Sequence, residues 1–268
     1  MSVITFYGNN KIETAQTTSM AAIATYLSIE KDYKILLINT KHNDDSLKEC
    51  FWSRTNNMHR NDIDTGIIGL IKAISSNKSS PEIITNYTKT VFKGRLEVLT
   101  SNNVPKEDYE KQKKYMANIV KMANKYYDLV FVDLEGSLVE QYVDDILKTT
   151  DLIVANTSQR IKFVKEFLEQ KVYSENIKDE NTIILIGKYD QYSKYNIKNL
   201  KRTNKIQEIC GIPYNTLFFE ACNEGKLADF MINFRKVKLE NIQGPVIEAI
   251  SEAGNKIVDK LKEIQMHF

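Results

Sequence analysis

The residues best suited to chemistry gather in one short segment, which runs from Gly8 to Ser19. An apolar run precedes this segment and a helical pattern follows it, which is the setting of a phosphate-binding loop. Such a loop uses glycines whose N–H groups wrap phosphates, a lysine that reaches the outer phosphates, and a hydroxyl that ligates Mg²⁺. The segment supplies Lys11, Thr17 and Thr18 but no glycine after Gly8, so it offers only part of such a site.

Composition defines the class of protein that carries this loop. The chain of 268 residues is 42% hydrophobic and 27% charged, which excludes a largely disordered protein. Its 37 Lys and Arg nearly balance its 35 Asp and Glu, so any basic site for nucleic acid must be local. Only 10 residues are glycine, below the usual share of about 7%, so few are available for a phosphate-binding loop.

Several features predict a cytoplasmic protein without an integral membrane segment. The N-terminal residues lack the basic and apolar regions of a signal peptide, and no stretch approaches the ~18 apolar residues of a membrane span. Cys50, Cys210 and Cys222 are odd in number and widely spaced, so we expect reduced thiols. The histidines share no metal-ligand spacing, so we expect no structural metal site.

Short apolar runs alternate with helical patterns along the chain. The runs are nearly continuous, which predicts strands buried on both faces of a mostly parallel sheet. Helical spacing of apolar residues predicts helices over 17–30, 107–126 and 159–172. The alternation predicts one α/β domain over 1–268, a single doubly wound sheet flanked by helices, with ligands at the carboxyl ends of its strands. The strands are predicted at 3–7, 35–38, 96–99, 129–132, 152–155 and 183–186.

The loop segment resembles the deviant Walker A motif of the ParA/MinD ATPases, which reads Lys-Gly-Gly-Val-Gly-Lys-Thr-Thr. In that register Lys11 matches the signature lysine, which family members extend to the nucleotide of a dimer partner. Thr17 and Thr18 match the two threonines, and Gln16 replaces the phosphate-binding lysine. The three loop glycines are replaced by Ile12, Glu13 and Ala15.

The resemblance continues in the family's order along most of the chain. Asp133 keeps the aspartate of the Walker B-like strand. Asn39 replaces the aspartate that ends the second strand in the family. Lys41 replaces the next aspartate, which in the family helps to position the attacking water. Gly187 stands where the family usually has a base-contacting asparagine, and Pro213 lies in the matching last strand and loop. This order implies a P-loop NTPase fold of the SIMIBI-like kind.

The resemblance implies a Mg-ATP site, vestigial or weak, in which Thr17 would ligate the metal. Neutral Gln16 cannot make the charge-assisted bond of a lysine, and losing one transition-state contact costs about 10²–10³ in rate. We therefore expect at most a weak ATPase. Its nucleotide-binding residues would be Lys11, Gln16, Thr17, Thr18, Asp133 and Pro213.

Three of these residues also have a purely structural interpretation. Lys11 can be a solvated loop lysine, Thr17 can cap the following helix through its hydroxyl, and Asp133 can hold the neighbouring loop. The sequence leaves both interpretations open.

Two functions follow from the resemblance. The segments 188–190 and 212–226 look most like the TadZ/CpaE pilus-positioning branch, which implies a dimeric localisation or assembly scaffold of a pilus or secretion system. A protein partner would recruit it to a pole or membrane. The alternative is an active ParA-like ATPase that partitions DNA or positions a cargo.

Basic and aromatic residues interleave between Lys188 and Lys205, a pattern that can bind nucleic acid. A solvated helix face explains the same pattern and is favoured. If DNA binds, its contacts are expected at Lys198, Lys201 and Arg202. The apolar spacing over 247–264, with a mixed polar face, favours a helix packed on the sheet over one that lies on a membrane.

Overall fold

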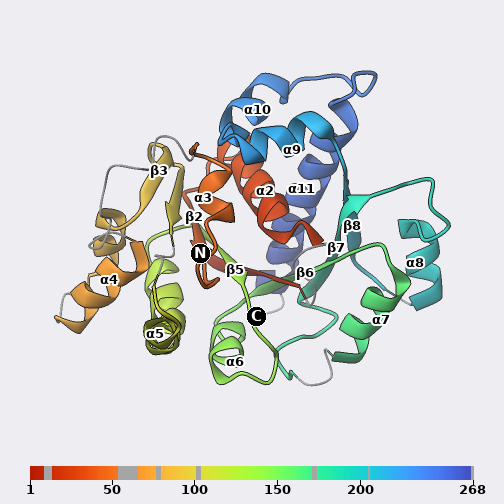
Figure 1. The fold of residues 1–268 in the computed structure, drawn as a ribbon. Helices are drawn as coiled ribbons and strands as arrows, with labels where there is room; N and C mark the ends of the chain where they lie inside the picture. The colour runs from red at the N-terminus through yellow and green to blue at the C-terminus, as the bar shows by residue number, and fades with distance from the viewer. Residues whose placement is uncertain are drawn as a thin grey trace.

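The computed structural model describes residues 1–8, 14–53, 66–76, 80–100, 104–170, 174–204 and 206–266. The predicted site residue Lys11 lies outside these residues, as do Ile12, Glu13 and Lys205. Within them, helices cover both faces of a central sheet of eight strands (Figure 1).

The sheet has the strand order β3-β4-β2-β5-β1-β6-β7-β8, and among the described strands only β3 and β4 pair antiparallel. This confirms the predicted α/β fold with a mostly parallel sheet. The strands are β1 (Ser2–Gly8), β2 (Ile35–Asn39), β3 (Lys89–Phe92), β4 (Leu96–Leu99), β5 (Leu129–Leu134), β6 (Leu152–Thr157), β7 (Thr182–Tyr189) and β8 (Ile209–Pro213).

Two apolar cores, one on each face of the sheet, hold the helices. The first core is built with α2 (Gln16–Glu30), α3 (Ser46–Glu49), α9 (Thr216–Asn223), α10 (Leu227–Phe234) and α11 (Gly244–Met266). The second is built with α4 (Gly66–Ser75), the 3₁₀ helix η2 (Pro81–Asn86), α5 (Lys106–Ala123), α6 (Gln141–Leu147), α7 (Ile161–Gln170) and α8 (Ile197–Asn204).

The strand sequences explain this double burial. Successive side chains of a strand point to opposite faces, so Ile4 and Phe6 of β1 enter the first core while Val3 and Tyr7 enter the second. All six residues of β5 are buried. A strand can be this apolar only when helices cover both of its faces, which is why the apolar runs predicted parallel strands correctly.

Two strands differ from the sequence predictions. β3 was not predicted, because it is a partly exposed edge strand and has no continuous apolar run. β8 starts at Ile209, before the segment matched to the last strand of the family. The prediction for the C-terminal helix is confirmed, since α11 packs against β8 and α2 and buries Ile250 and Ile257. Among the described residues, no helix has both the length and the apolar character to cross a membrane.

The sheet brings three loops together at the carboxyl ends of its central strands. β1 lies between β5 and β6, and β2 lies on the other side of β5. Asp133 of β5 is in register with Phe6 of β1 and Asn39 of β2. The start of α2 and the residues that follow β2 therefore meet around Asp133.

Gly225, in the turn between α9 and α10, is expected to tolerate no side chain. It has φ +75°, and a Cβ atom would lie 2.4 Å from the backbone of Trp52 and Ser53. Gly94 has φ +72° with nothing within 4 Å, so it is a matched control. Both alanine variants bear backbone strain of about 1–2 kcal/mol. Urea unfolding should show a clearly larger loss in the free energy of unfolding for Gly225→Ala than for Gly94→Ala. Equal losses would contradict the packing described here.

Candidate functional site

The end of the β1 loop is pressed against the neighbouring strand β7. Ala15 precedes α2 in the left-handed conformation, with φ 49° and ψ 34°, and no described side chain caps the helix. A Cβ atom on Gly187 would lie only 2.2 Å from the carbonyl oxygen of Thr14. Gly187, which replaces a base-contacting asparagine in the family register, therefore has a packing role: it lets the loop approach β7.

Gln16, the residue in the place of the phosphate-binding lysine, points into the protein. Its Nε2 donates to the carbonyl oxygen of Phe6 at 2.9 Å, to that of Leu134 at 3.1 Å and to Asp133 Oδ1 at 2.6 Å. Gly8 leaves room for this amide, because a Cβ atom there would lie 2.6 Å from Gln16 Oε1. The amide thus ties α2 to the carboxyl ends of β1 and β5.

Lys41 completes a buried cluster with Thr17 and Asp133. The hydroxyl of Thr17 donates to Asp133 Oδ2 at 2.6 Å and accepts a hydrogen bond from Lys41 Nζ. Lys41 Nζ also lies 2.8 Å from Asp133 Oδ2. The Lys41 side chain is only 6% exposed and that of Asp133 is 0% exposed. Both carboxylate oxygens of Asp133 are therefore bonded within the protein.

The loop after β2 positions Lys41. Its backbone N–H donates to Asn39 Oδ1 at 2.9 Å, while the Asn39 amide donates to the carbonyl oxygen of Asp44 at 2.8 Å. The hydroxyl and N–H of Thr40 donate to the carbonyl oxygen of Asp133 at 2.9 and 3.1 Å. Asn39, in place of an aspartate, thus shapes the turn that directs a lysine into the site.

This donor set does not fit a magnesium ion as it is arranged. Magnesium prefers oxygen ligands with octahedral geometry and retains several waters. Here the Thr17 hydroxyl and the Asp133 carboxylate instead surround an ammonium group. A divalent cation would have to displace that ammonium, which cannot leave the chain. Lys41 pairs with the buried Asp133 at 2.8 Å and also lies 4.0 Å from Oδ2 of the partly exposed Asp44.

These contacts bear on the structural interpretations of two residues. The capping interpretation of Thr17 is wrong, because its hydroxyl donates to Asp133 and the first residue before α2 is Ala15. The loop-holding interpretation of Asp133 agrees with the structure, since it binds the segments after both β1 and β2. The resemblance to the ParA/MinD motif identified Lys41 as a substitution for an aspartate. It did not show that the Lys41 ammonium reaches Asp133.

Thr18 and Pro213 meet in a different place, a cavity of about 170 Å³ between the start of α2 and the loop after β8. The Thr18 hydroxyl donates to the carbonyl oxygen of Ala15 at 3.1 Å. Small-molecule pockets are usually about 300–1,000 Å³, so this cavity is too small for a whole nucleotide. Cys222 lines it, and its hydrogen bond with Cys50, together with burial, raises the pKa of the Cys50 thiol well above its usual value.

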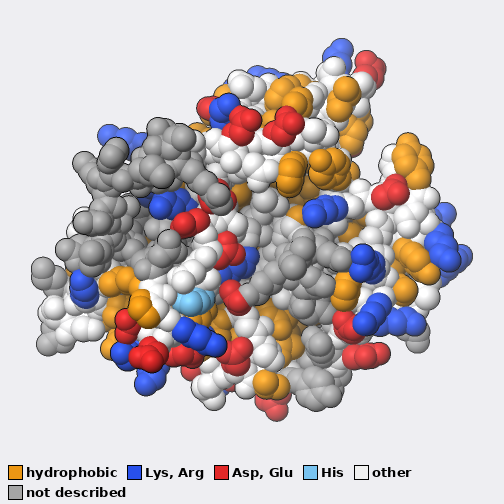
Figure 2. Space-filling model, in the orientation of Figure 1, with side chains coloured by type: hydrophobic (Ala, Val, Ile, Leu, Met, Phe, Trp, Pro, Cys, Tyr) orange, Lys and Arg blue, Asp and Glu red, His pale blue; other side chains and the backbone are white. Residues whose placement is uncertain are grey.

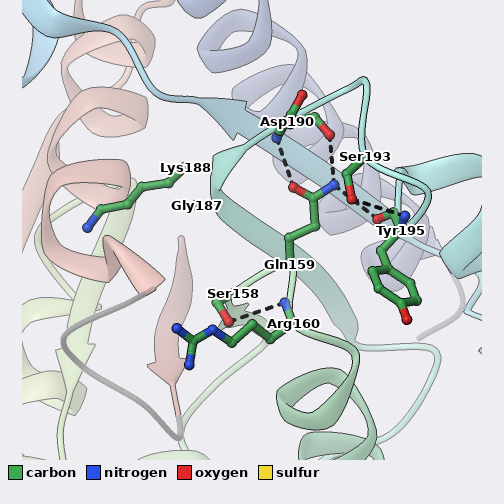
Figure 3. A pocket seen from close by; sticks show the side chains of 8 residues that line it. All are labelled: Ser158, Gln159, Arg160, Gly187, Lys188, Asp190, Ser193 and Tyr195. Carbon is green, nitrogen blue, oxygen red and sulfur yellow. Dashed lines mark hydrogen bonds between the residues drawn. The ribbon is translucent and has the colours of Figure 1, made fainter.

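A larger pocket of about 440 Å³ opens at the carboxyl ends of β6 and β7 (Figure 3). Gln159 joins its walls, because the side chain donates to the carbonyl oxygen of Asp190 at 2.7 Å and accepts from the Asp190 N–H at 2.8 Å. Arg160 and Lys188 extend to one side of the pocket (Figure 3), and Lys188 has a positive φ of 53°. Sequence reasoning missed Gln159 and Arg160, since neither belongs to a motif.

The predicted nucleic-acid residues lie apart from this site, on α8. Lys198 and Arg202 are exposed and Lys201 is half-buried. Figure 2 shows Lys and Arg side chains gathered over the α8 region on the right of the molecule. The structure thus confirms that these residues share one exposed helix, and leaves their ligand untested.

Comparisons with known proteins support the fold. No protein-family model and no curated protein sequence matches the chain. Several solved structures are similar to it. A ParA family ATPase from Chlorobium tepidum has a TM-score of 0.71 at 14% identity and covers 95% of this chain and 98% of its own.

Two further similar structures contain nucleotides. A putative plasmid partition protein from Borrelia burgdorferi, bound to AMPPNP, has a TM-score of 0.62 at 15% identity and covers 99% of this chain and 98% of its own. MinD from Pyrococcus horikoshii, complexed with Mg-ADP, has a TM-score of 0.66 at 13% identity and covers 97% of this chain and 98% of its own. The chain therefore has the P-loop NTPase fold of the ParA/MinD ATPases.

Replacing Lys41 should leave the buried Asp133 carboxylate without its ammonium partner. Breaking a buried ion pair from one side typically costs about 3–5 kcal/mol, so we expect Lys41→Met to lower the free energy of unfolding by that order. The double variant Lys41→Met/Asp133→Asn should recover a substantial part, because no charge is then left buried. Chemical unfolding followed by circular dichroism measures both. A loss below ~1 kcal/mol, typical of an exposed pair, would contradict this account.

Proposed function

We propose that the chain is a degenerate ParA/MinD-like protein that acts as a dimeric localisation or assembly scaffold, with weak or absent ATP hydrolysis. One observation carries the proposal: the Asp133 carboxylate, which an ATPase of this fold would direct toward its metal, is bonded on both oxygens to Gln16, Thr17 and Lys41. The proposed site is thus closed by its own side chains.

The energy needed to open the cluster supports weak nucleotide binding. Mg-ATP would have to break the Lys41–Asp133 pair and turn Gln16 outward. If separating the buried pair costs about 3–5 kcal/mol, binding weakens by roughly 10²- to 10³-fold or more. Mg-ATP remains the nucleotide that we propose for the weak site, because two similar structures are described with AMPPNP and Mg-ADP.

The partner of the scaffold would be a protein of a pilus or secretion system. The likeness of 188–190 and 212–226 to the TadZ/CpaE branch of the deviant Walker A family supports this choice. We further propose a cytoplasmic homodimer that this partner recruits to a pole or membrane. Exposed apolar side chains at Tyr214, Leu217 and Phe219 provide surface on which such contacts could form.

Phosphate release measures the enzymatic part of the proposal. We expect Mg-ATP turnover at background level, the same for the wild type and for the Asp133→Asn variant, because Asp133 is not available to a metal. Calorimetry should show no tight binding of Mg-ATP, and light scattering should give the same mass with and without it. Brisk turnover that Asp133→Asn abolishes would contradict the proposal.

A second candidate function is an active ParA-like ATPase that partitions DNA or positions a cargo. The observation that favours it is the basic surface of α8, formed by the exposed Lys198 and Arg202 and the half-buried Lys201. Phosphate contacts by such residues would make DNA binding fall steeply with salt.

Charge reversal tests this alternative. If α8 binds DNA, Lys198→Glu/Lys201→Glu/Arg202→Glu should abolish a salt-sensitive shift of duplex DNA in an electrophoretic assay. Reversal of Lys236 and Lys238, which are exposed on another part of the chain, is the control. Unchanged DNA retention in the α8 variant would exclude this surface, and the proposed scaffold predicts no DNA shift at all.

A further inference from the structure

β8 is the last strand of the sheet, and in the described part of the chain only one of its edges is paired. The N–H of Ile184 in β7 donates to the carbonyl oxygen of Glu208 at 2.9 Å, and Ile184 is in register with Ile209. In a parallel ladder the residues that bond to the neighbouring strand alternate with those that do not. Ile209 and Gly211 therefore direct their backbone N–H and C=O groups outward, away from β7.

A groove of about 630 Å³ runs along this free edge. Ile209, Gly211 and Pro213 of β8 line it, with α11 on one side and the segment after β7 on the other. Ile209 is buried, whereas Gly211 and Pro213 are half-buried, so another chain can reach this edge at Gly211.

The α11 wall of the groove is acidic. Glu248 and Glu252 lie one helical turn apart, line the groove and are exposed. Lys256, the next residue of the same stripe, is already paired with Glu208 at 2.7 Å. This wall therefore presents two carboxylates whose charge the neighbouring lysine does not balance.

The opposite wall is aromatic. Tyr192 is 88% exposed, and Tyr189 lies flat against β8 because a Cβ atom on Gly211 would be only 2.7 Å from its ring. At the mouth of the groove, Asp190 and Lys188 carry opposite charges. The two walls thus differ in chemistry: carboxylates stand on one face of the sheet and tyrosine rings on the other.

We propose that this groove binds an extended segment of a partner protein, added to β8 as a further strand, in which basic side chains alternate with apolar ones. The backbone of the segment bonds to the outward N–H and C=O groups of Gly211, in the usual mode of strand addition. Successive side chains of a strand point to opposite faces. Every second side chain therefore meets Glu248 and Glu252, and the intervening ones meet Tyr189 and Tyr192.

Fluorescence anisotropy with two labelled synthetic peptides tests the charge pattern. The full chain should bind Lys-Val-Lys-Val-Lys-Val-Lys saturably and should not bind the peptide with glutamate in place of lysine. Glu248→Lys/Glu252→Lys should weaken binding about tenfold or more at low salt, since each exposed pair contributes modestly and reversal adds repulsion. Glu220→Lys/Glu240→Lys carries the same change of charge at exposed positions away from the groove and should leave binding intact.

N-methylated peptides test the strand geometry. The N–H groups of the lysines point to one edge of an extended peptide and those of the valines to the other. Methylating one set should abolish binding, and methylating the other should leave it nearly unchanged. Equal effects of the two sets, or binding that ignores the reversal at Glu248 and Glu252, would overturn the proposal. A dimer of this chain that the same reversal dissolves would assign the groove to a second copy and would also overturn it.

Discussion

The buried carboxylate of Asp133 is the constraint on which the site depends. A charge without solvent must be paired and hydrogen-bonded, or its burial costs several kcal/mol. This chain meets that requirement with its own groups: the ammonium of Lys41, the hydroxyl of Thr17 and the amide of Gln16. The helix after β1 and the loop after β2 are both held to β5 through this one side chain.

Four residues that depart from the family pattern, Gln16, Asn39, Lys41 and Gly187, are consistent with one another. Gln16 is neutral where a lysine would add a second positive charge beside the buried Lys41. Asn39 supplies the turn that directs Lys41 inward. Gly187 lets the chain at Thr14 and Ala15 pack against β7. Taken together, these residues support the proposal that the chain keeps the fold of the ParA/MinD ATPases with weak or absent ATP hydrolysis.

Much of the fold was predictable, because strands covered on both faces leave continuous apolar runs such as 129–132 and 183–186. β3 was not, since an exposed edge strand leaves no such run. Gln16, Thr17 and Asp133 could be placed in one site by their register. The inward course of Lys41 and the free edge of β8 could not, because each depends on how distant segments pack rather than on local sequence.

The central claim is that the Lys41 ammonium permanently holds the place of a magnesium ion. Nuclear magnetic resonance of the ¹⁵N-labelled lysine side chains, during a titration with Mg-ATP, tests it most directly. A buried, hydrogen-bonded ammonium should give a slowly exchanging signal, assigned by its loss in Lys41→Met, that stays unchanged throughout the titration. Loss or displacement of that signal at stoichiometric Mg-ATP would show that the metal replaces the lysine and would contradict the claim.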